Sequence, residues 1–286
     1  MSNQIVKMST CAFCTNLCGV LAHVEDGRII KLEGNPNHPL SRGFVCERMR
    51  LAIKWLYHPD QLLYPLKRTG KRGEGNWQRI GWDEALGEIG QKLLKLRQEY
   101  GPETLAIMGG EDKANNYWPR GRFLSLFGNP YNSFGHGVMC GVNDMAINRA
   151  VMGDDSSHAG SILGANCVVY WGANPSESNH RTWATILKQR QERDIKMIVI
   201  DPRQTDTSKI ADIWLQPRPG TDTALALAWL NVIINEHLYD KDFVENWTVG
   251  FDQLKQRVQE YPPERCSEIT GIPTEKIVEA ARVYGT

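Results

Sequence analysis

The sequence predicts an α/β protein in which a small β-rich lobe precedes one or more doubly wound domains built on a parallel sheet. Near the N-terminus, the Asp26-Gly27 pair separates two short apolar segments, and both of its turn positions favour positive φ, so a β-hairpin is expected. Farther along, short apolar segments alternate with segments of helical period. Such alternation with short connections is typical of a parallel sheet covered by helices.

Length and charge narrow the possible functions. The 286 residues suffice for about two domains, which we place at 4–60 for the lobe and 61–286 for the α/β region. Basic and acidic residues number 33 each, so no field of one sign points to nucleic acid or to an anionic membrane surface. No apolar segment approaches the roughly 20 residues of a membrane span.

The first ten residues are polar and contain neither a twin-arginine pair nor an apolar signal segment. This favours a cytoplasmic location, where thiols stay reduced and are free to bind metal. The seven cysteines are an odd number, which argues against a complete disulfide framework.

The elements of the lobe follow from turn residues and short apolar segments. The hairpin at residue 26 is followed by a rigid, proline-containing loop over 34–39 that returns the chain to Cys46. A short helix is expected over Leu51 to Tyr57. The basic, glycine-rich segment from Lys67 to Asn76 has no apolar period and is expected to be a connector.

The elements of the α/β region follow from apolar periodicity. Helices are expected over 82–100, 116–127, 143–151, 180–193 and 222–236, and the tail from 240 to 284 is helical by pattern. Buried strands are expected over 104–108, 167–171, 196–200 and 212–215.

Four cysteines, spaced C-x2-C-x3-C-x27-C, are the strongest chemical signal: Cys11, Cys14, Cys18 and Cys46. Three thiolates on one tight loop and a fourth from farther along suit a [4Fe–4S] cluster, because each ligand binds a separate iron corner. Structural zinc usually requires two C-x2-C pairs, and only one is present here. A zinc site and unligated cysteines remain the alternatives.

Three loops are expected at the edge of the sheet where the parallel strands end, which is where such sheets bind ligands. Their candidate cofactor-binding residues are Trp171, Gly172, Asn174 and Pro175 in the first loop, Asp201 and Arg203 in the second, and Gly220, Thr221 and Asp222 in the third.

The chemistry of these loops favours a nucleotide. Asp201 suits ribose hydroxyls, Arg203 suits a phosphate or a purine, and Asp222 is able to accept two N–H bonds from a guanine edge. The simpler alternative is that Thr221 or Asp222 only caps a helix. Neither G-x-G-x-x-G nor G-x4-G-K-[ST] occurs, so an ordinary NAD site or P-loop is not supported.

The other three cysteines stand alone. Cys140 precedes a helical stretch, and a thiolate at a helix N-terminus has a lowered pKa and is able to bind a metal or act as a nucleophile. Taken alone, such a cysteine is more often a small buried hydrophobe. Cys167 begins an expected core strand and Cys266 lies in the helical tail, so both are expected to be structural.

These motifs, taken in order, closely resemble the N-terminal part of the molybdopterin oxidoreductases of the dimethyl sulfoxide reductase superfamily. Besides the cysteines, the matching segments are Gly34-Asn-Pro with Gly43-x-x-Cys46, Tyr64-Pro-Leu-Lys67, Arg79-Ile-x-Trp82-Asp-Glu-Ala85, Trp171-Gly-x-Asn174, Asp201-Pro-Arg203 and Pro219-Gly-Thr-Asp222. The resemblance covers nearly the whole chain.

The resemblance implies a molybdenum- or tungsten-dependent oxidoreductase. Its cofactors would be a [4Fe–4S] cluster, which relays electrons, and a metal held by two molybdopterin guanine dinucleotides. The four cysteines would bind the cluster, Cys140 would be the protein ligand of the metal, and the three loops would hold one dinucleotide, with Asp222 reading its base. Many members carry a lysine just after the fourth cysteine, between cluster and pterin, and here Arg48 is the nearest cation.

Departures from the family bear on the reaction. Gly141 stands where formate dehydrogenases have a catalytic histidine, which disfavours formate oxidation. The tail and the Cys140 region also resemble acetylene hydratase, a non-redox tungsten member, but Thr15 stands where that enzyme has an aspartate. An acetylene-hydratase-like lyase is therefore an alternative, and a non-catalytic iron–sulfur electron-transfer or scaffold subunit is another.

Catalytic chains of this family are considerably longer, and a C-terminal domain holds most of the second dinucleotide. We therefore expect this chain to be a fragment, a truncated gene product or half of a split enzyme, and to be inactive alone. It would need the missing portion or a complementary chain, a small-molecule substrate and, by family analogy, an iron–sulfur electron-transfer subunit.

Overall fold

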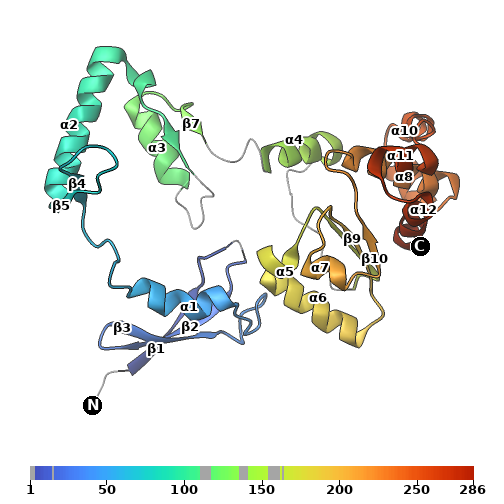
Figure 1. Ribbon diagram of the computed structural model, residues 1–286, viewed down its shortest axis with the longest axis horizontal. Coiled ribbons are helices and arrows are strands. Elements are labelled where there is room, and N and C mark those ends of the chain that lie inside the picture. Colours follow the sequence, from blue (N-terminus) through green and yellow to red (C-terminus); the bar gives the residue numbers. More distant parts are fainter. Residues whose placement is uncertain (1–3, 15, 110–116, 135–140, 154–161, 163) are drawn as a thin grey trace. The chain divides into compact units, whose positions relative to one another are not determined.

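The computed structural model describes residues 4–14, 16–109, 117–134, 141–153, 162 and 164–286. The chain divides into two compact units, Met1–Ala159 and Gly160–Thr286. Figure 1 labels the helices and strands of both units. The expected division near residue 60 stays a prediction.

The first unit begins with a three-stranded antiparallel sheet in the order β1-β2-β3. Its strands are β1 (Gln4–Thr10), β2 (Gly19–Glu25) and β3 (Arg28–Gly34). Asp26 and Gly27, at the turn between β2 and β3, have φ of 47° and 78°. Both residues have a left-handed backbone conformation, which a two-residue hairpin turn of this kind requires. The hairpin prediction is confirmed.

The helix α1 (Glu47–Leu56) begins directly after Cys46, four positions before the expected start at Leu51. Charged residues fill its first turn, so the apolar pattern shows only its second half, although Met49 is buried. Farther along, β4 (Leu66–Arg68) and β5 (Trp77–Arg79) form an antiparallel hairpin. The segment that we expected to be a plain connector is therefore mostly a hairpin loop.

The rest of the first unit is mainly helical. Its elements are α2 (Trp82–Tyr100), η1 (Pro102–Thr104), β6 (Ile107–Met108), α3 (Tyr117–Phe127), β7 (Ser133–Phe134) and α4 (Gly141–Met152). The bounds of α2 agree with the prediction. The prediction of a buried strand over 104–108 is wrong in both length and burial. Only Ile107 and Met108 form a strand, which pairs with β7, and Met108 is 84% exposed.

The second unit contains a parallel sheet in the order β10-β9-β8. Its strands β8 (Cys167–Trp171), β9 (Lys196–Ile200) and β10 (Ile213–Leu215) match the predicted segments closely. The helices between them are α5 (Pro175–Ser178), α6 (His180–Glu192) and α7 (Asp206–Lys209). The chain continues through α8 (Asp222–Asn235), α9 (Lys241–Trp247), α10 (Phe251–Val258), α11 (Pro263–Thr270) and α12 (Thr274–Gly285).

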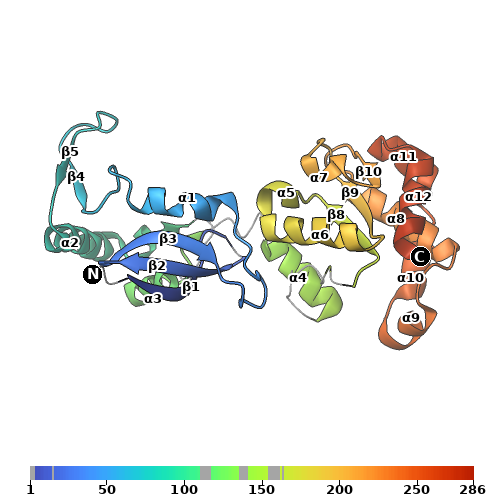
Figure 2. The ribbon, with the colours of Figure 1, turned by 90° about the horizontal axis from the view of Figure 1, so that it is seen from below.

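Helices cover both faces of this sheet (Figure 2). Ile198 and Ile200 of β9 pack into a core with residues of α8, α11 and α12. Met197 and Val199, which alternate with them along the strand, pack with Ile186 of α6 on the other face. Because side chains of a strand alternate between faces, this double burial explains why β9 reads as a continuous apolar segment. The doubly wound prediction is confirmed.

No helix among the described residues is long and apolar enough to span a membrane.

Candidate functional site

The loop between β1 and β2 carries three of the predicted cluster ligands. The register of the two strands places Thr10 opposite Gly19, and the N–H of Cys11 donates to the C=O of Cys18 at 2.8 Å. The loop therefore begins at Cys11 and ends at Cys18, whose backbones are hydrogen-bonded to each other, and Cys14 lies between them in the sequence. Leu17 takes a left-handed conformation, φ 44°, and its N–H lies 3.4 Å from the C=O of Cys14.

Electrostatic coupling links the fourth cysteine to this loop. Partial burial raises the pKa of the Cys11 thiol, and the charges of Cys14 and Cys46 raise it further. An N–H···S bond from the Phe13 backbone and the positive charge of Arg48 act in the opposite direction. Cys46 is the last residue before α1.

The thiols suit a cluster chemically. Within the described part of the chain, Cys11, Cys14, Cys18 and Cys46 form no disulfide and are all partly exposed. Among the described residues, no three His, Cys, Asp or Glu side chains are grouped so as to hold a single metal ion. A [4Fe–4S] cluster instead takes one thiolate at each of four separate irons, and this donor set fits that requirement.

A tight loop returns the chain from β3 to Cys46. The N–H of Gly43 donates to the C=O of Asn35 at 2.9 Å, and the N–H of Asn35 donates to the C=O of Gly19 at 2.9 Å. A Cβ on Gly34 would lie 2.0 Å from the carbonyl oxygen of Gly43, so a side chain at residue 34 would force the loop apart. This close approach gives a physical reason for glycine at that motif position.

The aromatic residue between the first two cysteines contacts α1. The rings of Phe13 and Trp55 meet edge to face, with centroids 5.8 Å apart. No motif in the sequence indicates this pair, because nothing in the spacing of the two residues links the cysteine loop to the last turn of a later helix.

In the second unit, the three predicted loops meet at the edge where the parallel strands end. Trp171 pairs with Ile200 in the β8–β9 register, and the N–H of Gly172 donates to the C=O of Ile200 at 2.8 Å. The indole N–H of Trp171 then donates to Oδ1 of Asp222 at 2.7 Å. This bond brings the first predicted loop and the third together.

Two glycines leave open space at this edge. Gly172 and Gly220 have φ of 58° and 84°, and a Cβ at either position would meet no atom within 4 Å. Left-handed glycines with open space beside them allow a ligand to approach the backbone closely. The backbone at both positions is therefore open on the side where a side chain would otherwise project.

Asp201 is 6% exposed, and its carboxylate and backbone both shape its loop. Its Oδ1 accepts the backbone N–H of Arg203 at 2.8 Å, and its backbone C=O accepts the indole N–H of Trp214 at 2.9 Å. The side chain of Arg203 is exposed.

The third loop does not support the simple capping alternative. Thr221 precedes α8 but makes no side-chain cap, because its hydroxyl donates to the C=O of Arg218 at 2.6 Å. The side chain of Asp222 is exposed and accepts from Trp171.

Asn174 connects the first loop to two residues outside the predicted set, Ser176 and Thr207. Its Oδ1 accepts the hydroxyls of Ser176 and Thr207, each at 2.7 Å, and Thr207 is fully buried. Its Nδ2 is buried and has no hydrogen-bond partner among the described residues. The available signal for Ser176 was its position directly after the predicted Pro175, whereas nothing in the pattern indicated Thr207, which lies in α7.

The remaining candidate, Cys140, lies outside the described residues, and α4 begins at the next position. Of the two cysteines expected to be structural, Cys266 is fully buried and Cys167, the first residue of β8, is partly buried, and burial raises the pKa of both thiols.

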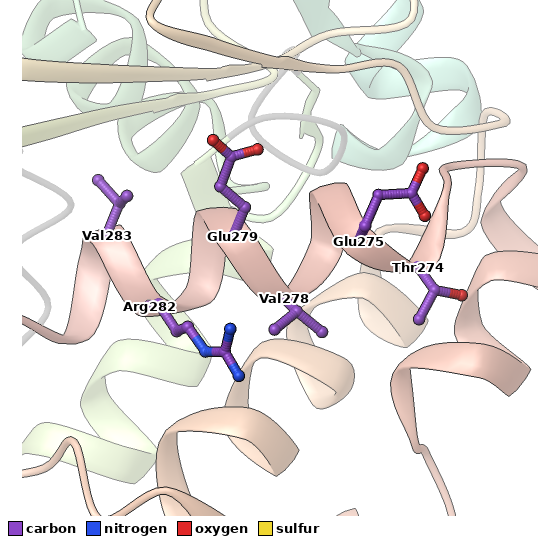
Figure 3. A pocket seen from close by; sticks show the side chains of 6 residues that line it. All are labelled: Thr274, Glu275, Val278, Glu279, Arg282 and Val283. Atoms are coloured by element: carbon purple, nitrogen blue, oxygen red, sulfur yellow. The ribbon is translucent and has the colours of Figure 1, made fainter.

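A surface hollow in the second unit lies on α12, away from the predicted site residues (Figure 3). Its lining residues all belong to that helix: Thr274, Glu275, Val278, Glu279, Arg282 and Val283. Glu275 and Glu279 point to the same side of α12, one turn apart. No predicted site residue lines it.

Comparison with known proteins identifies two family domains. Residues 5–58 match the molybdopterin oxidoreductase Fe4S4 domain, and residues 62–281 match the molybdopterin oxidoreductase domain.

Several relatives match along nearly the whole chain. Acetylene hydratase of Syntrophotalea acetylenica is 42% identical over 98% of this chain and 38% of its own length. The thiosulfate reductase molybdopterin-containing subunit of Salmonella typhimurium is 33% identical over 96% of this chain and 36% of its own. The solved structure of acetylene hydratase from Pelobacter acetylenicus matches with a TM-score of 0.82 and 41% identity, covering 96% of this chain and 38% of that one.

The chain thus spans well under half the length of the relatives that it matches. It corresponds to the portion of them that carries the Fe4S4 domain. The chain belongs to the molybdopterin oxidoreductase family, whose cofactors are a [4Fe–4S] cluster and molybdenum or tungsten held by molybdopterin.

Proposed function

We propose that this chain is the cluster- and cofactor-binding portion of a molybdenum- or tungsten-dependent oxidoreductase. The observation that carries the proposal is the match of residues 5–58 to the Fe4S4 domain, because all four disulfide-free cysteines lie in that segment, three on the β1–β2 loop and Cys46 directly before α1. We assign Cys11, Cys14, Cys18 and Cys46 as the four ligands of the [4Fe–4S] cluster.

The protein around these thiolates supplies charge compensation. The Phe13 N–H and the Arg48 guanidinium both favour the ionised form of Cys11. Hydrogen bonds to a ligand sulfur and a nearby cation stabilise added negative charge, so both groups would favour the reduced cluster. We assign Arg48 as the cation between cluster and pterin.

The three loops of the second unit would hold one guanine dinucleotide. Gly172 and Gly220 leave room for close approach, Arg203 offers an exposed guanidinium for a phosphate, and Asp222 presents a carboxylate that Trp171 orients. A carboxylate is the side chain that accepts two parallel N–H bonds from a guanine edge.

Cys140 is proposed as the protein ligand of the metal. A thiolate is a soft ligand compatible with molybdenum or tungsten. When bound, the metal would supply oxygen-atom or hydride chemistry while the cluster relays electrons. In the complete enzyme, Cys140→Ala is expected to abolish activity and to leave about four irons per chain in place. Unchanged activity would refute this ligand assignment.

A second candidate function is hydration of acetylene, which the 42% identity to acetylene hydratase favours. That reaction adds water to a triple bond and needs a proton donor but no electron acceptor. Thr15 stands beside the second cluster cysteine, where that enzyme has an aspartate, and a threonine hydroxyl is a far weaker acid than a carboxyl group. We therefore favour a redox reaction, with an iron–sulfur subunit as electron-transfer partner.

The two candidates differ in their electron balance, so one assay on the complete enzyme separates them. A redox enzyme will oxidise or reduce a viologen dye in step with conversion of a small-molecule substrate. A hydratase will form acetaldehyde from acetylene and water with the dye omitted. Acetaldehyde formation at a rate independent of any dye would overturn the redox proposal.

A further inference from the structure

A small polar network lies beside the proposed cluster site, in the loop that leads from β3 to Cys46. Ser41 is 4% exposed, and its hydroxyl oxygen accepts the backbone N–H of Gly19 at 3.0 Å. Its backbone N–H donates to Nδ1 of His38 at 3.1 Å, and its hydroxyl lies 3.0 Å from the same nitrogen.

The network has one consistent assignment of hydrogens. Nδ1 of His38 accepts the Ser41 N–H, so this nitrogen carries no proton and the ring proton lies on Nε2. The Ser41 hydroxyl proton shares the single Nδ1 lone pair with the Ser41 N–H, in a three-centre bond, and the hydroxyl oxygen accepts the Gly19 N–H. Every polar atom of the buried hydroxyl is satisfied in this arrangement.

The network joins the two segments that carry the cluster ligands. Gly19 directly follows Cys18, and the loop of Ser41 leads to Cys46. Gly19 bonds to this loop on both sides, through its N–H to Ser41 and through its C=O to the N–H of Asn35 at 2.9 Å. A Cβ on Gly19 would lie 2.5 Å from Cβ of His38, so the imidazole also packs directly on this backbone.

We propose that Ser41 and His38 are positioning residues, which hold the segment of Cys18 and the segment of Cys46 in register for binding of the cluster. This inference rests on the proposed ligand assignment. Thiolates held in place bind a cluster without a further ordering cost, whereas loosening one segment lets its ligand leave sooner.

The test compares iron release from the cluster-loaded 286-residue chain under anaerobic conditions, with a coloured iron chelator as the acceptor. Losing one such hydrogen bond costs about 1 kcal/mol, which corresponds to roughly a fivefold change. Ser41→Ala and His38→Leu are expected to release iron about fivefold to tenfold faster than the unchanged chain. His38→Asn keeps an acceptor at the position of Nδ1 and is expected to stay within about twofold.

His58 offers a matched control. Its Nδ1 accepts the backbone N–H of Asp60 at 3.2 Å, so it makes the same kind of local bond outside the cysteine-bearing segments. His58→Ala is expected to release iron at the unchanged rate. Equal rates for Ser41→Ala and the unchanged chain would overturn the proposal, as would His38→Asn behaving like His38→Leu.

A second measurement separates failure of this inference from failure of the cluster assignment. Hydrogen exchange at the Gly19 amide, followed in the chain without metal, is expected to be slow and to accelerate by about fivefold or more in Ser41→Ala. If the unchanged chain binds no iron, the cluster assignment fails, whatever the amide does. If the Gly19 amide exchanges freely in the unchanged chain, the network itself is refuted.

Discussion

The indole N–H of Trp171 donates to Oδ1 of Asp222 over 2.7 Å, which joins the end of β8 to the first residue of α8. The indole is itself held, because its ring packs edge to face on Trp229 with centroids 5.6 Å apart. The carboxylate proposed to read guanine is therefore oriented by a partly buried side chain that packs against the core of the second unit.

Trp171→Phe tests this orientation. The change keeps an aromatic ring against Trp229 but removes the N–H, so the Asp222 carboxylate loses its partner. The affinity for guanosine diphosphate, measured by titration calorimetry on the 286-residue chain, is expected to fall about fivefold to tenfold. Trp247 is 77% exposed and lies on α9, so Trp247→Phe is the matched control and is expected to bind like the unchanged chain. Equal affinity for the Trp171 and Trp247 variants would contradict the proposed orientation.

Asp222→Asn tests the base contact itself. The amide retains one acceptor but places a donor where the second guanine N–H would bind, so affinity for guanosine diphosphate is expected to fall about tenfold or more. Affinity for adenosine diphosphate is expected to change much less. Asp206→Asn is the control, because this exposed carboxylate pairs with Lys209 in α7. A parallel loss for both nucleotides would show that Asp222 does not select guanine.

Ionisation of Tyr170 is expected to destabilise the folded chain at alkaline pH. Burial raises the pKa of its phenol to about 12 from an ordinary value of 10.0, because the hydroxyl is enclosed without a partner among the described residues. The folded chain thus holds the proton more tightly than the unfolded one. Stability present below pH 10 is expected to be lost as the pH rises from about 10 toward 12.

Tyr170→Phe removes the titrating group, so its midpoint of urea denaturation is expected to fall less over that pH interval. Near neutral pH the variant is expected to be as stable as the unchanged chain, since no described partner loses a bond. An identical alkaline loss in both proteins would show that Tyr170 does not cause it.

The packing of α12 on the sheet is tested by Ile277→Ala. Ile277 is fully buried in the same core as Ile198 and Leu215, so truncation leaves a cavity and is expected to lower the free energy of unfolding by about 2–5 kcal/mol. Val249 is fully exposed, and Val249→Ala is the control with little expected change. Urea denaturation of both variants measures the difference. A loss below about 1 kcal/mol at Ile277 would show that α12 is not packed as described.

Local patterns were sufficient to predict most of the elements. The strands β8 and β9 were predictable because both faces of the sheet are buried, which makes each strand a short continuous apolar segment. The hairpin at Asp26 and Gly27 was predictable because its turn requires residues that tolerate positive φ. In contrast, the apolar segment over 104–108 predicted a buried strand, whereas only Ile107 and Met108 pair.

The site was predictable only as a set of separate motifs. The cysteine spacing indicated the ligands that we propose, and strand order indicated which loops share an edge. The bonds from Trp171 to Asp222, from Gly19 to Ser41 and from Thr207 to Asn174 join residues distant in the chain, and no local period encodes such pairings. They depend on the tertiary fold, so they emerge only from the structure.

The central claim is tested most directly by measuring Fe, Mo, W and Zn by mass spectrometry on native protein purified without oxygen, after its chain composition has been established. The account predicts about four irons per chain together with molybdenum or tungsten. Zinc without iron would contradict the assignment of Cys11, Cys14, Cys18 and Cys46 to a [4Fe–4S] cluster, and iron without molybdenum or tungsten would contradict the proposed metal-dependent oxidoreductase.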